Sequence, residues 1–349
     1  MESFFQKYGV DEKVIAVAVS GGADSLALVL QLQKTGKKIV AITVDHGLRG
    51  ESAQEAEYVA EIMAKNHIEH HILKWEGKKP ETGIEEAARQ ARYKLMVEFC
   101  KSRQIKVLAV GHHLRDQAET FLLRLQRGSG VFGLSCMQPV VNCEGVKIIR
   151  PQLNKTPEQL KTFLTEKKVD WIEDPMNQDE DFVRVKIRKF LPKLAHIGID
   201  EKKLYETAFV LSKTRAFLQR LVDDFIKNNV RWWSDVVVGV SWTKIKNLDE
   251  EVAMPVLGQL LQKVGRAQYS PEAAELARVL AQGNDFRGCT LGKCELFIAA
   301  KRLWIVPQDE KNILMTNCDW DDFLKKNPEY VNSGLPYKVR RALWQKFKE

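Results

Sequence analysis

Several features that assign a chain to a common class are missing from this sequence. Its 349 residues contain six cysteines, and none forms a C-x-x-C pair. A disulfide scaffold, a zinc ribbon and a redox dithiol are therefore poorly supported. The longest early apolar run, Val14–Val19, is far too short to span a bilayer. Because the first residues also lack the pattern of a signal peptide, we expect a soluble cytoplasmic protein that does not enter a membrane.

Composition and charge indicate an ordered globular protein with an anionic partner. The chain is 44% hydrophobic and 29% charged, which is ordinary for a folded protein and long enough for two domains. Its formal net charge is +8, with a pI of about 9.0. Such a surplus attracts nucleic acid through phosphate contacts. A solvated basic surface without a partner remains the alternative.

The first half of the chain alternates short apolar runs with amphipathic stretches, the pattern of a parallel α/β sheet. Helices are expected after each strand, over 26–34, 52–66, 84–103 and 114–125. The predicted strands are Val14–Val19, Ile39–Asp45, Ile68–Leu73 and Lys106–Gly111. Since these runs are apolar on both faces, helices should cover both sides of the sheet.

The pattern changes after about residue 150. Helices are predicted over 157–168, 181–194 and 203–229, with a turn at Pro175 and Asn177. A second unit should start near Val230, with helices ending near Val264 and Gln282. Its short strands are predicted at Cys289–Leu291, Leu296–Ala300 and Leu303–Val306. Residues after about 319 are polar and basic and receive no assignment.

A glycine pair lies between the first predicted strand and its helix, in the string SGGADS. Two glycines allow close approach of the backbone, and a helix N-terminus offers free N–H groups. The string matches neither G-x-x-x-x-G-K-[ST] nor G-x-G-x-x-G, so a Walker-type NTPase or a dinucleotide fold is disfavoured. We interpret it as a phosphate-binding loop rather than a plain turn. The predicted ATP-binding residues are Ser20, Gly21, Gly22, Ala23, Asp24 and Ser25.

Polar motifs follow three of the predicted strands, at positions where ligands bind in open parallel sheets. They should therefore meet in one crevice. His112, Asp116 and Glu119 have helical spacing and can share one helix face, which suits proton transfer, support of a metal ion or the positioning of an ammonium group. A helix-capping pair with a solvated carboxylate face is the alternative. The candidate catalytic residues are Asp24, Asp45, His112, His113, Asp116 and Glu119.

Asp24 and Asp45 are also candidate Mg²⁺ ligands, because this ion takes one or two carboxylates besides phosphate oxygens and water. The alternative for each is a capping or turn aspartate. No H-E-x-x-H motif supports a zinc site.

The loop string resembles the PP-loop of the N-type ATP pyrophosphatases, which cleave ATP between its α and β phosphates. Further motifs narrow the resemblance: VDHGLR from Val44, AARQARY from Ala87, GHHLRDQAET from Gly111 and LRLQRGSG from Leu123. In this order and spacing they resemble the tRNA(Ile)-lysidine synthetases, over about residues 10–195. Weaker similarity continues through Gly288–Pro307.

The resemblance implies a doubly wound, mainly parallel α/β sheet of the adenine nucleotide α-hydrolase type over residues 1–200. A helical connector would follow over 201–229, then a smaller α+β domain contacting tRNA over 230–318 and a basic tail over 319–349. It also implies a reaction. ATP and Mg²⁺ activate C2 of the wobble cytidine in an isoleucine tRNA with a CAU anticodon, and free L-lysine then attacks C2 to give lysidine. A homodimer is left open.

Basic residues of these motifs, and of the basic helix predicted over 181–194, are the expected tRNA or lysine contacts. They are Arg49, Arg89, Arg92, Arg124, Arg127, Arg184, Lys186 and Arg188. Two positions depart from the family pattern. Val185 stands where asparagine is usual, and Arg115 stands where aspartate is frequent, which leaves a role for either position open. Trp232 and Trp233 could stack on bases, but core packing is favoured.

Two rival functions are weighed against this one. A tRNA thiolase with the same loop would generally need paired cysteines to carry sulfur, and none is present. A non-catalytic nucleotide- or tRNA-binding module would require the acidic and histidine positions to be lost, yet Asp24, Asp45, Asp116 and Glu119 are all retained.

Overall fold

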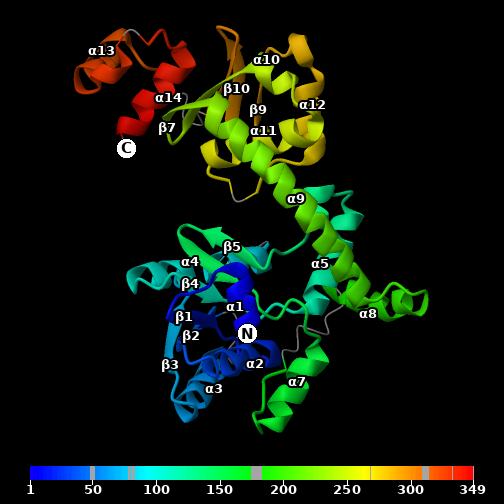
Figure 1. Cartoon of the computed structure of the whole chain (residues 1–349). Helices are drawn as coiled ribbons and strands as arrows, with labels where there is room; N and C mark the ends of the chain where they lie inside the picture. Colours follow the sequence, from blue (N-terminus) through cyan, green and yellow to red (C-terminus); the bar gives the residue numbers. More distant parts are fainter. Residues whose placement is uncertain are drawn as a thin grey trace. The chain divides into compact units, whose positions relative to one another are not determined.

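The computed structural model in Figure 1 describes residues 1–47, 52–77, 79, 83–173, 183–267, 269–308, 314–331 and 333–348. They form two compact units, Met1–Lys213 and Thr214–Glu349. None of the helices within these ranges is long and apolar enough to cross a bilayer.

The first unit is built on a six-stranded sheet with the order β3-β2-β1-β4-β6-β5, in which only the edge strand β5 pairs antiparallel. Its strands are β1 (Val14–Ala18), β2 (Lys38–Asp45), β3 (Glu69–Lys74), β4 (Val107–Ala109), β5 (Val140–Cys143) and β6 (Val146–Ile149). The strand order reverses between β1 and β4. That reversal is the topological switch point where such folds bind ligands.

Helices cover both faces of this sheet, because each strand buries alternate apolar side chains on opposite sides. One core contains Ile15 and Val17 together with α1 (Glu2–Tyr8), α2 (Ala23–Gln33), α3 (Ser52–Lys65) and α7 (Pro157–Glu166). The other contains Ala16 and Leu108 with α4 (Ile84–Ser102). In Figure 1, α4 lies across the sheet from α2 and α3.

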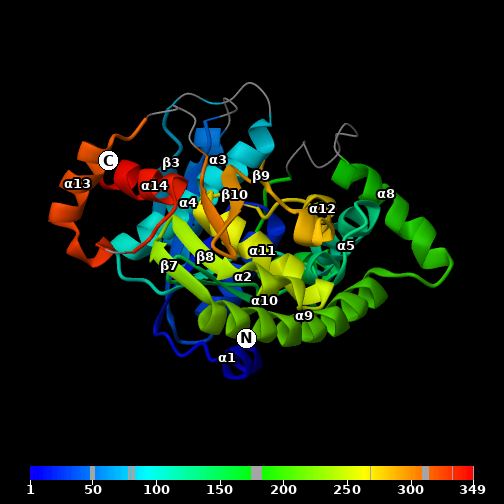
Figure 2. The same cartoon turned by 90° about the horizontal axis from the view of Figure 1, so that it is seen from above.

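A third apolar cluster joins the helices beyond β4. Ala118 and Phe121 of α5 (Leu114–Gln126) pack against Leu191 of α8 (Val183–His196) and against Leu204 and Ala208 of α9 (Glu201–Asn229). The short helix α6 (Val131–Leu134) follows α5. Figure 2 shows α5, α8 and the start of α9 side by side.

The second unit is a five-stranded antiparallel sheet, β7-β8-β11-β10-β9, with helices on both faces. Its strands are β7 (Val230–Ser234), β8 (Val237–Ser241), β9 (Gly288–Leu291), β10 (Cys294–Ala299) and β11 (Arg302–Pro307). Its helices are α10 (Trp242–Lys246), α11 (Glu250–Val264), α12 (Ala273–Ala281), α13 (Asn317–Lys326) and α14 (Tyr337–Lys348).

The predicted fold class, a doubly wound and mainly parallel sheet followed by a smaller α+β part, is confirmed. The predicted strands and helices of both halves are present within a few residues. The structure adds the hairpins β5–β6 and β7–β8, the helix α1, and the helices α13 and α14 in the basic segment. Trp232 and Trp233 both pack against apolar clusters, so the core interpretation is confirmed. Because α9 contributes Leu204 to the first unit and Val222 to the second, the boundaries of the connector stay a prediction.

Candidate active site at the carboxyl edge of the parallel sheet

The predicted phosphate loop is closed on itself by one hydroxyl group. Ser25 Oγ accepts from Ser20 N at 3.1 Å and donates to Gly22 O at 3.0 Å. Gly21 has a φ of +86°, which a glycine adopts freely. Gly22 N-caps α2 without a side-chain cap, so the first N–H groups of this helix stay available for an anion. The local geometry is therefore that of a phosphate cradle.

Gly111, just beyond β4, lets that strand approach the loop closely. A Cβ at this position would lie 3.1 Å from Ser25 N and 3.2 Å from Asp24 C. Both neighbours are backbone atoms, which move only if the loop moves. The glycine therefore brings the ends of β1 and β4 together at the switch point.

Three polar side chains meet across this junction. His113 Nε2 lies 3.4 Å from Asp24 Oδ2, and His113 Nδ1 lies 3.4 Å from Asp116 Oδ2. His113 also N-caps α5, since its Nδ1 accepts from Asp116 N and Asp116 Oδ2 accepts from His113 N. In the neutral imidazole the proton therefore sits on Nε2, facing Asp24. Of the three motifs expected to meet, those after the first and fourth strands contact each other here.

The pKa of His113 reflects these neighbours. Burial by itself lowers the pKa of His113, but the hydrogen bond to Asp24 and the charges of Asp116, Asp24 and Glu119 raise it overall. The imidazole is thereby biased toward its charged form, between two carboxylates.

His112 has the opposite environment. Burial and then the positive charges of Arg150, Arg89 and Arg92 lower the pKa of His112 well below its usual value. Its Nδ1 is buried, and no described atom forms a hydrogen bond with it. His112 is therefore a neutral imidazole beside arginines, and a weak base.

Glu119 is the most buried carboxylate of the site, with no exposed surface. Its Oε1 accepts from Arg188 Nε at 2.7 Å, which ties α5 to α8. Its Oε2 is buried with no hydrogen-bond partner among the described residues. Burial raises the pKa of Glu119, and the neighbouring Arg188 only partly offsets this. A buried acceptor of this kind calls for a donor from a ligand.

Asp45 at the end of β2 takes part in a turn. Its Oδ1 accepts from Ser52 Oγ at 2.7 Å and from Gly47 N at 2.8 Å, and these bonds lower the pKa of Asp45. This is the turn aspartate that the sequence left as an alternative. Within the described ranges no three His, Cys, Asp or Glu side chains form a metal cluster, so a Mg²⁺ role for Asp24 and Asp45 stays a prediction.

The predicted basic residues fall into three groups. Arg89 and Arg92 are half-buried and contact the ring of Tyr93. The exposed side chains are those of Arg124, Arg127, Arg184 and Lys186. Arg188 differs, because it is paired with Glu119. Arg49 and the turn at Pro175 and Asn177 lie outside the described residues.

Both departures from the family pattern have a structural explanation. Arg115 donates from Nη2 to Glu158 and from Nε to Glu201, each at 2.7 Å. It therefore links α5 with the first turns of α7 and α9. Val185 in α8 is only 5% exposed. An apolar side chain at this buried position needs no hydrogen-bond partner, whereas an asparagine would need one.

The structure brings in residues that sequence reasoning missed. Arg150 and Gln152 follow β6 and are buried. The Gln152 amide can donate to Asp24 O and accept from Leu28 N, each at 3.2 Å. Ile172 N donates to Gly21 O at 3.0 Å. The arginine after an apolar strand was the one available signal, because parallel strands place such residues at the ligand edge.

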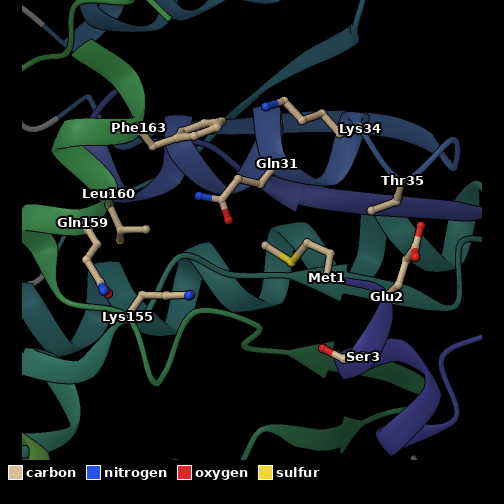
Figure 3. Close-up of a pocket in the computed structure, with 10 residues that line it drawn as sticks. All are labelled: Met1, Glu2, Ser3, Gln31, Lys34, Thr35, Lys155, Gln159, Leu160 and Phe163. Carbon is tan, nitrogen blue, oxygen red and sulfur yellow. The ribbon is translucent and has the colours of Figure 1, made fainter. Parts of the chain in front are cut away.

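A cavity of about 690 Å³ lies elsewhere on the first unit. Figure 3 shows its lining, which comes from the start of α1, the C-terminal end of α2 and the start of α7. None of the predicted site residues lines it, so this cavity is distinct from the candidate site at the switch point.

Together, the serine-closed loop at a helix N-terminus and the switch point beside it define an ATP-binding domain of the PP-loop class. The family model of the PP-loop domain matches residues 1–194. The chain is also 33% identical over 305 residues to a tRNA(Ile)-lysidine synthase of Ruegeria pomeroyi, covering 83% of this chain and 70% of that protein. It is 33% identical over 309 residues to a tRNA(Ile)-lysidine synthase of Wolbachia pipientis, covering 85% of this chain and 71% of that protein. The chain belongs to the tRNA(Ile)-lysidine synthase family.

Among solved structures, the chain is similar to a U34-tRNA thiolase from Methanococcus maripaludis. The TM-score is 0.52 at 17% identity, covering 60% of this chain and 78% of the thiolase. At this identity the similarity shows the shared fold alone.

Proposed function

We propose that this protein joins free L-lysine to C2 of the wobble cytidine in an isoleucine tRNA with a CAU anticodon, at the expense of ATP. The observation that carries the proposal is the convergence at the switch point. Asp24 from the ATP loop and Asp116 from α5 meet at His113, and α5 also carries the buried, half-satisfied carboxylate of Glu119. This arrangement would hold ATP chemistry and amine recognition on neighbouring elements.

In the first step, the C2 carbonyl oxygen of the cytidine attacks the α-phosphorus of ATP, and pyrophosphate leaves. The N–H groups at the start of α2, with the hydroxyls of Ser20 and Ser25, would stabilise the negative charge on the phosphates. Adenylation turns the poor leaving group at C2 into a good one. RNA loops present unpaired bases for this kind of access.

Mg²⁺ fits the site because the Asp24 carboxylate is 38% exposed beside the phosphate loop. Asp45 would be the second ligand, because the side-chain hydrogen bonds from Gly47 N and Ser52 Oγ both reach Oδ1 rather than Oδ2. When bound, the ion would neutralise charge on the leaving pyrophosphate.

In the second step, the lysine ε-amine attacks C2, and AMP leaves with the former carbonyl oxygen. The ammonium group must first lose a proton. We assign its binding and deprotonation to Glu119, whose Oε2 lacks a partner and whose pKa is raised by burial. Asp116 on the same helix supplies a second negative charge. His112 is disfavoured as the base because burial, and then the neighbouring arginines, lower its pKa.

The thiolase alternative is disfavoured by the chemistry of the cysteines. All six are free, with Cys100 and Cys294 buried. Burial raises the pKa of Cys100, Cys136 and Cys294 to about 12 in each case. Sulfur carriers need an accessible thiolate, which these last three thiols do not provide at neutral pH.

The test is incorporation of radiolabelled lysine into RNA. The protein is incubated with ATP, Mg²⁺ and a transcript of an isoleucine tRNA with a CAU anticodon, and compared with Asp24→Ala. We expect label that resists mild base, unlike an aminoacyl ester, and that is lost in the variant. A transcript with the wobble cytidine replaced by uridine is the matched substrate control. Pyrophosphate release without incorporation would contradict lysine as the nucleophile.

A further inference from the structure

The candidate site at the switch point has a second side, opposite the ATP loop. Helix α2, which carries the loop at its N-terminus, packs in the core on one face of the sheet, and α4 packs in the core on the other. Because α4 connects the parallel strands β3 and β4, it runs antiparallel to both. Its first half, with Arg89 and Arg92, therefore lies at the carboxyl edge. Whatever binds these arginines approaches the switch point from the face that the ATP loop does not occupy.

Arg150 reaches the same edge from β6. Strands β4 and β6 pair in parallel with Ala109 opposite Ile149, and Val110 N donates to Ile149 O at 3.0 Å. Arg150 is only 8% exposed. Its Nη1 donates to Gln138 O at 2.8 Å, but Nε is buried and makes no hydrogen bond to any described atom. A buried N–H donor without an acceptor in the protein is expected to bind an acceptor from a ligand.

The surroundings of Arg150 hold positive charge without a balancing carboxylate. The guanidinium carbons of Arg89 and Arg92 lie 5.6 and 5.9 Å from the ring centroid of Tyr93, whose side chain also hydrogen-bonds Arg150. No described acidic residue is seen to form an ion pair with any of the three arginines. The nearby histidines, His112 and His46, both have lowered pKa values, first through burial and then through these arginines. Unpaired buried cations are costly, and an anionic ligand would remove that cost.

We propose that Arg150, together with Arg89 and Arg92, binds a phosphodiester of the RNA substrate next to the target cytidine, from the side of the site opposite the ATP loop. The inference rests on the proposed function and deepens it by assigning Arg150. Guanidinium groups suit phosphate because their N–H groups can bind two oxygens at once. The phosphates of ATP share this chemistry, but the first turn of α2 already provides their cradle on the other face.

The test measures binding of an RNA hairpin with a CAU anticodon loop to the full chain, without ATP. Arg150→Gln should weaken binding at least about tenfold, as expected for loss of a hydrogen bond to a charged group. The slope of log Kd against log salt should fall by about one. With a hairpin whose phosphodiesters flanking the cytidine are neutral methylphosphonates, wild type and variant should bind alike. Arg103→Gln is the control, since Arg103 is exposed at the other end of α4.

Two results would overturn the proposal. The first is an Arg150→Gln variant that melts like the wild type and also binds the hairpin with the wild-type affinity and salt slope. The other is a raised KM for ATP with unchanged hairpin affinity, which would assign the site to ATP phosphates. If Arg150→Gln does not fold, Arg92→Gln decides with the same pair of hairpins. Lysine transfer by the wild type is measured alongside. It tests the proposed function by itself, so failure of the proposed function can be told apart from failure of the role assigned to Arg150.

Discussion

The imidazole of His113 lies 3.4 Å from the carboxylate of Asp24, so a histidine that caps α5 also touches the ATP loop after β1. The contact joins two elements that are far apart in the sequence. It fixes where α5 begins relative to the loop, and hence where Glu119 points. A change at His113 should therefore affect both half-reactions.

The raised pKa of His113 predicts how the contribution of this residue to stability changes with pH. A histidine whose pKa is raised by folding stabilises the protein most below its ordinary pKa of 6.5, and loses that contribution as the pH rises through the raised value. The free energy of unfolding of wild type, minus that of His113→Gln, should therefore be largest in mild acid and shrink with rising pH. Urea titrations across the pH range measure it. A difference that grows with pH would mean that His113 is held neutral.

Gly111 should be needed for ATP affinity. In Gly111→Ala the new methyl group meets Ser25 N and Asp24 C at 3.1 and 3.2 Å, which forces the loop to shift. Overpacking of this kind costs about 1–3 kcal/mol, and we expect the KM for ATP to rise about tenfold or more. Gly130→Ala is the control, since its Cβ would meet nothing within 4 Å. Equal KM values for the two variants would contradict the close approach.

Arg115 should stabilise the packing of α5 rather than the chemistry. In a double-mutant cycle of Arg115→Met and Glu201→Gln, we expect a coupling of about 1 kcal/mol in urea unfolding. Glu158 should couple less, because its side chain is 66% exposed. Arg115→Asp, which restores the residue frequent in the family, should destabilise the fold by facing two glutamates. Additive effects of Arg115→Met and Glu201→Gln would show that the link contributes nothing.

Much of this site could be predicted from the sequence because its chemistry is concentrated in contiguous motifs. The loop Ser20–Ser25 and the segment 111–120 each follow a buried strand, and the rule that parallel strands share a carboxyl edge brings them together. The strands β1, β2 and β4 were equally clear, since each is a buried apolar run.

The rest depends on long-range pairing that periodicity does not encode. Arg150 belongs to the site only because β6 pairs beside β4, and β6 is a four-residue strand in a hairpin. The partner of Arg188 could not be foreseen either. A basic helix predicts a charged face, whereas the pairing with Glu119 arises from the packing of α8 on α5. Helices α13 and α14 were not predicted, because their buried apolar residues, such as Trp320 and Phe323 in α13, are interspersed with charged ones.

The buried carboxylate of Glu119 should lower the free energy of unfolding at neutral pH. Because burial raises the pKa of Glu119, its charged form is less stable in the folded chain than in the unfolded one, and stability should fall as the pH rises through that range. Glu119→Gln keeps the shape and a hydrogen-bond acceptor for Arg188. We therefore expect this variant to have a higher free energy of unfolding at neutral pH. A lower value in urea unfolding would show that the ion pair with Arg188 dominates.

The central claim is that one site contains two distinct functions, ATP chemistry at Asp24 and amine chemistry at Glu119. The most direct test is a single-turnover reaction of Glu119→Gln with ATP labelled in its α-phosphate, the isoleucine tRNA and lysine. The account predicts that labelled adenylate accumulates on the tRNA while lysine transfer falls by about 100-fold or more, whereas Asp24→Ala gives neither product. Lysine transfer at the wild-type rate in Glu119→Gln, or no adenylated tRNA, would contradict it.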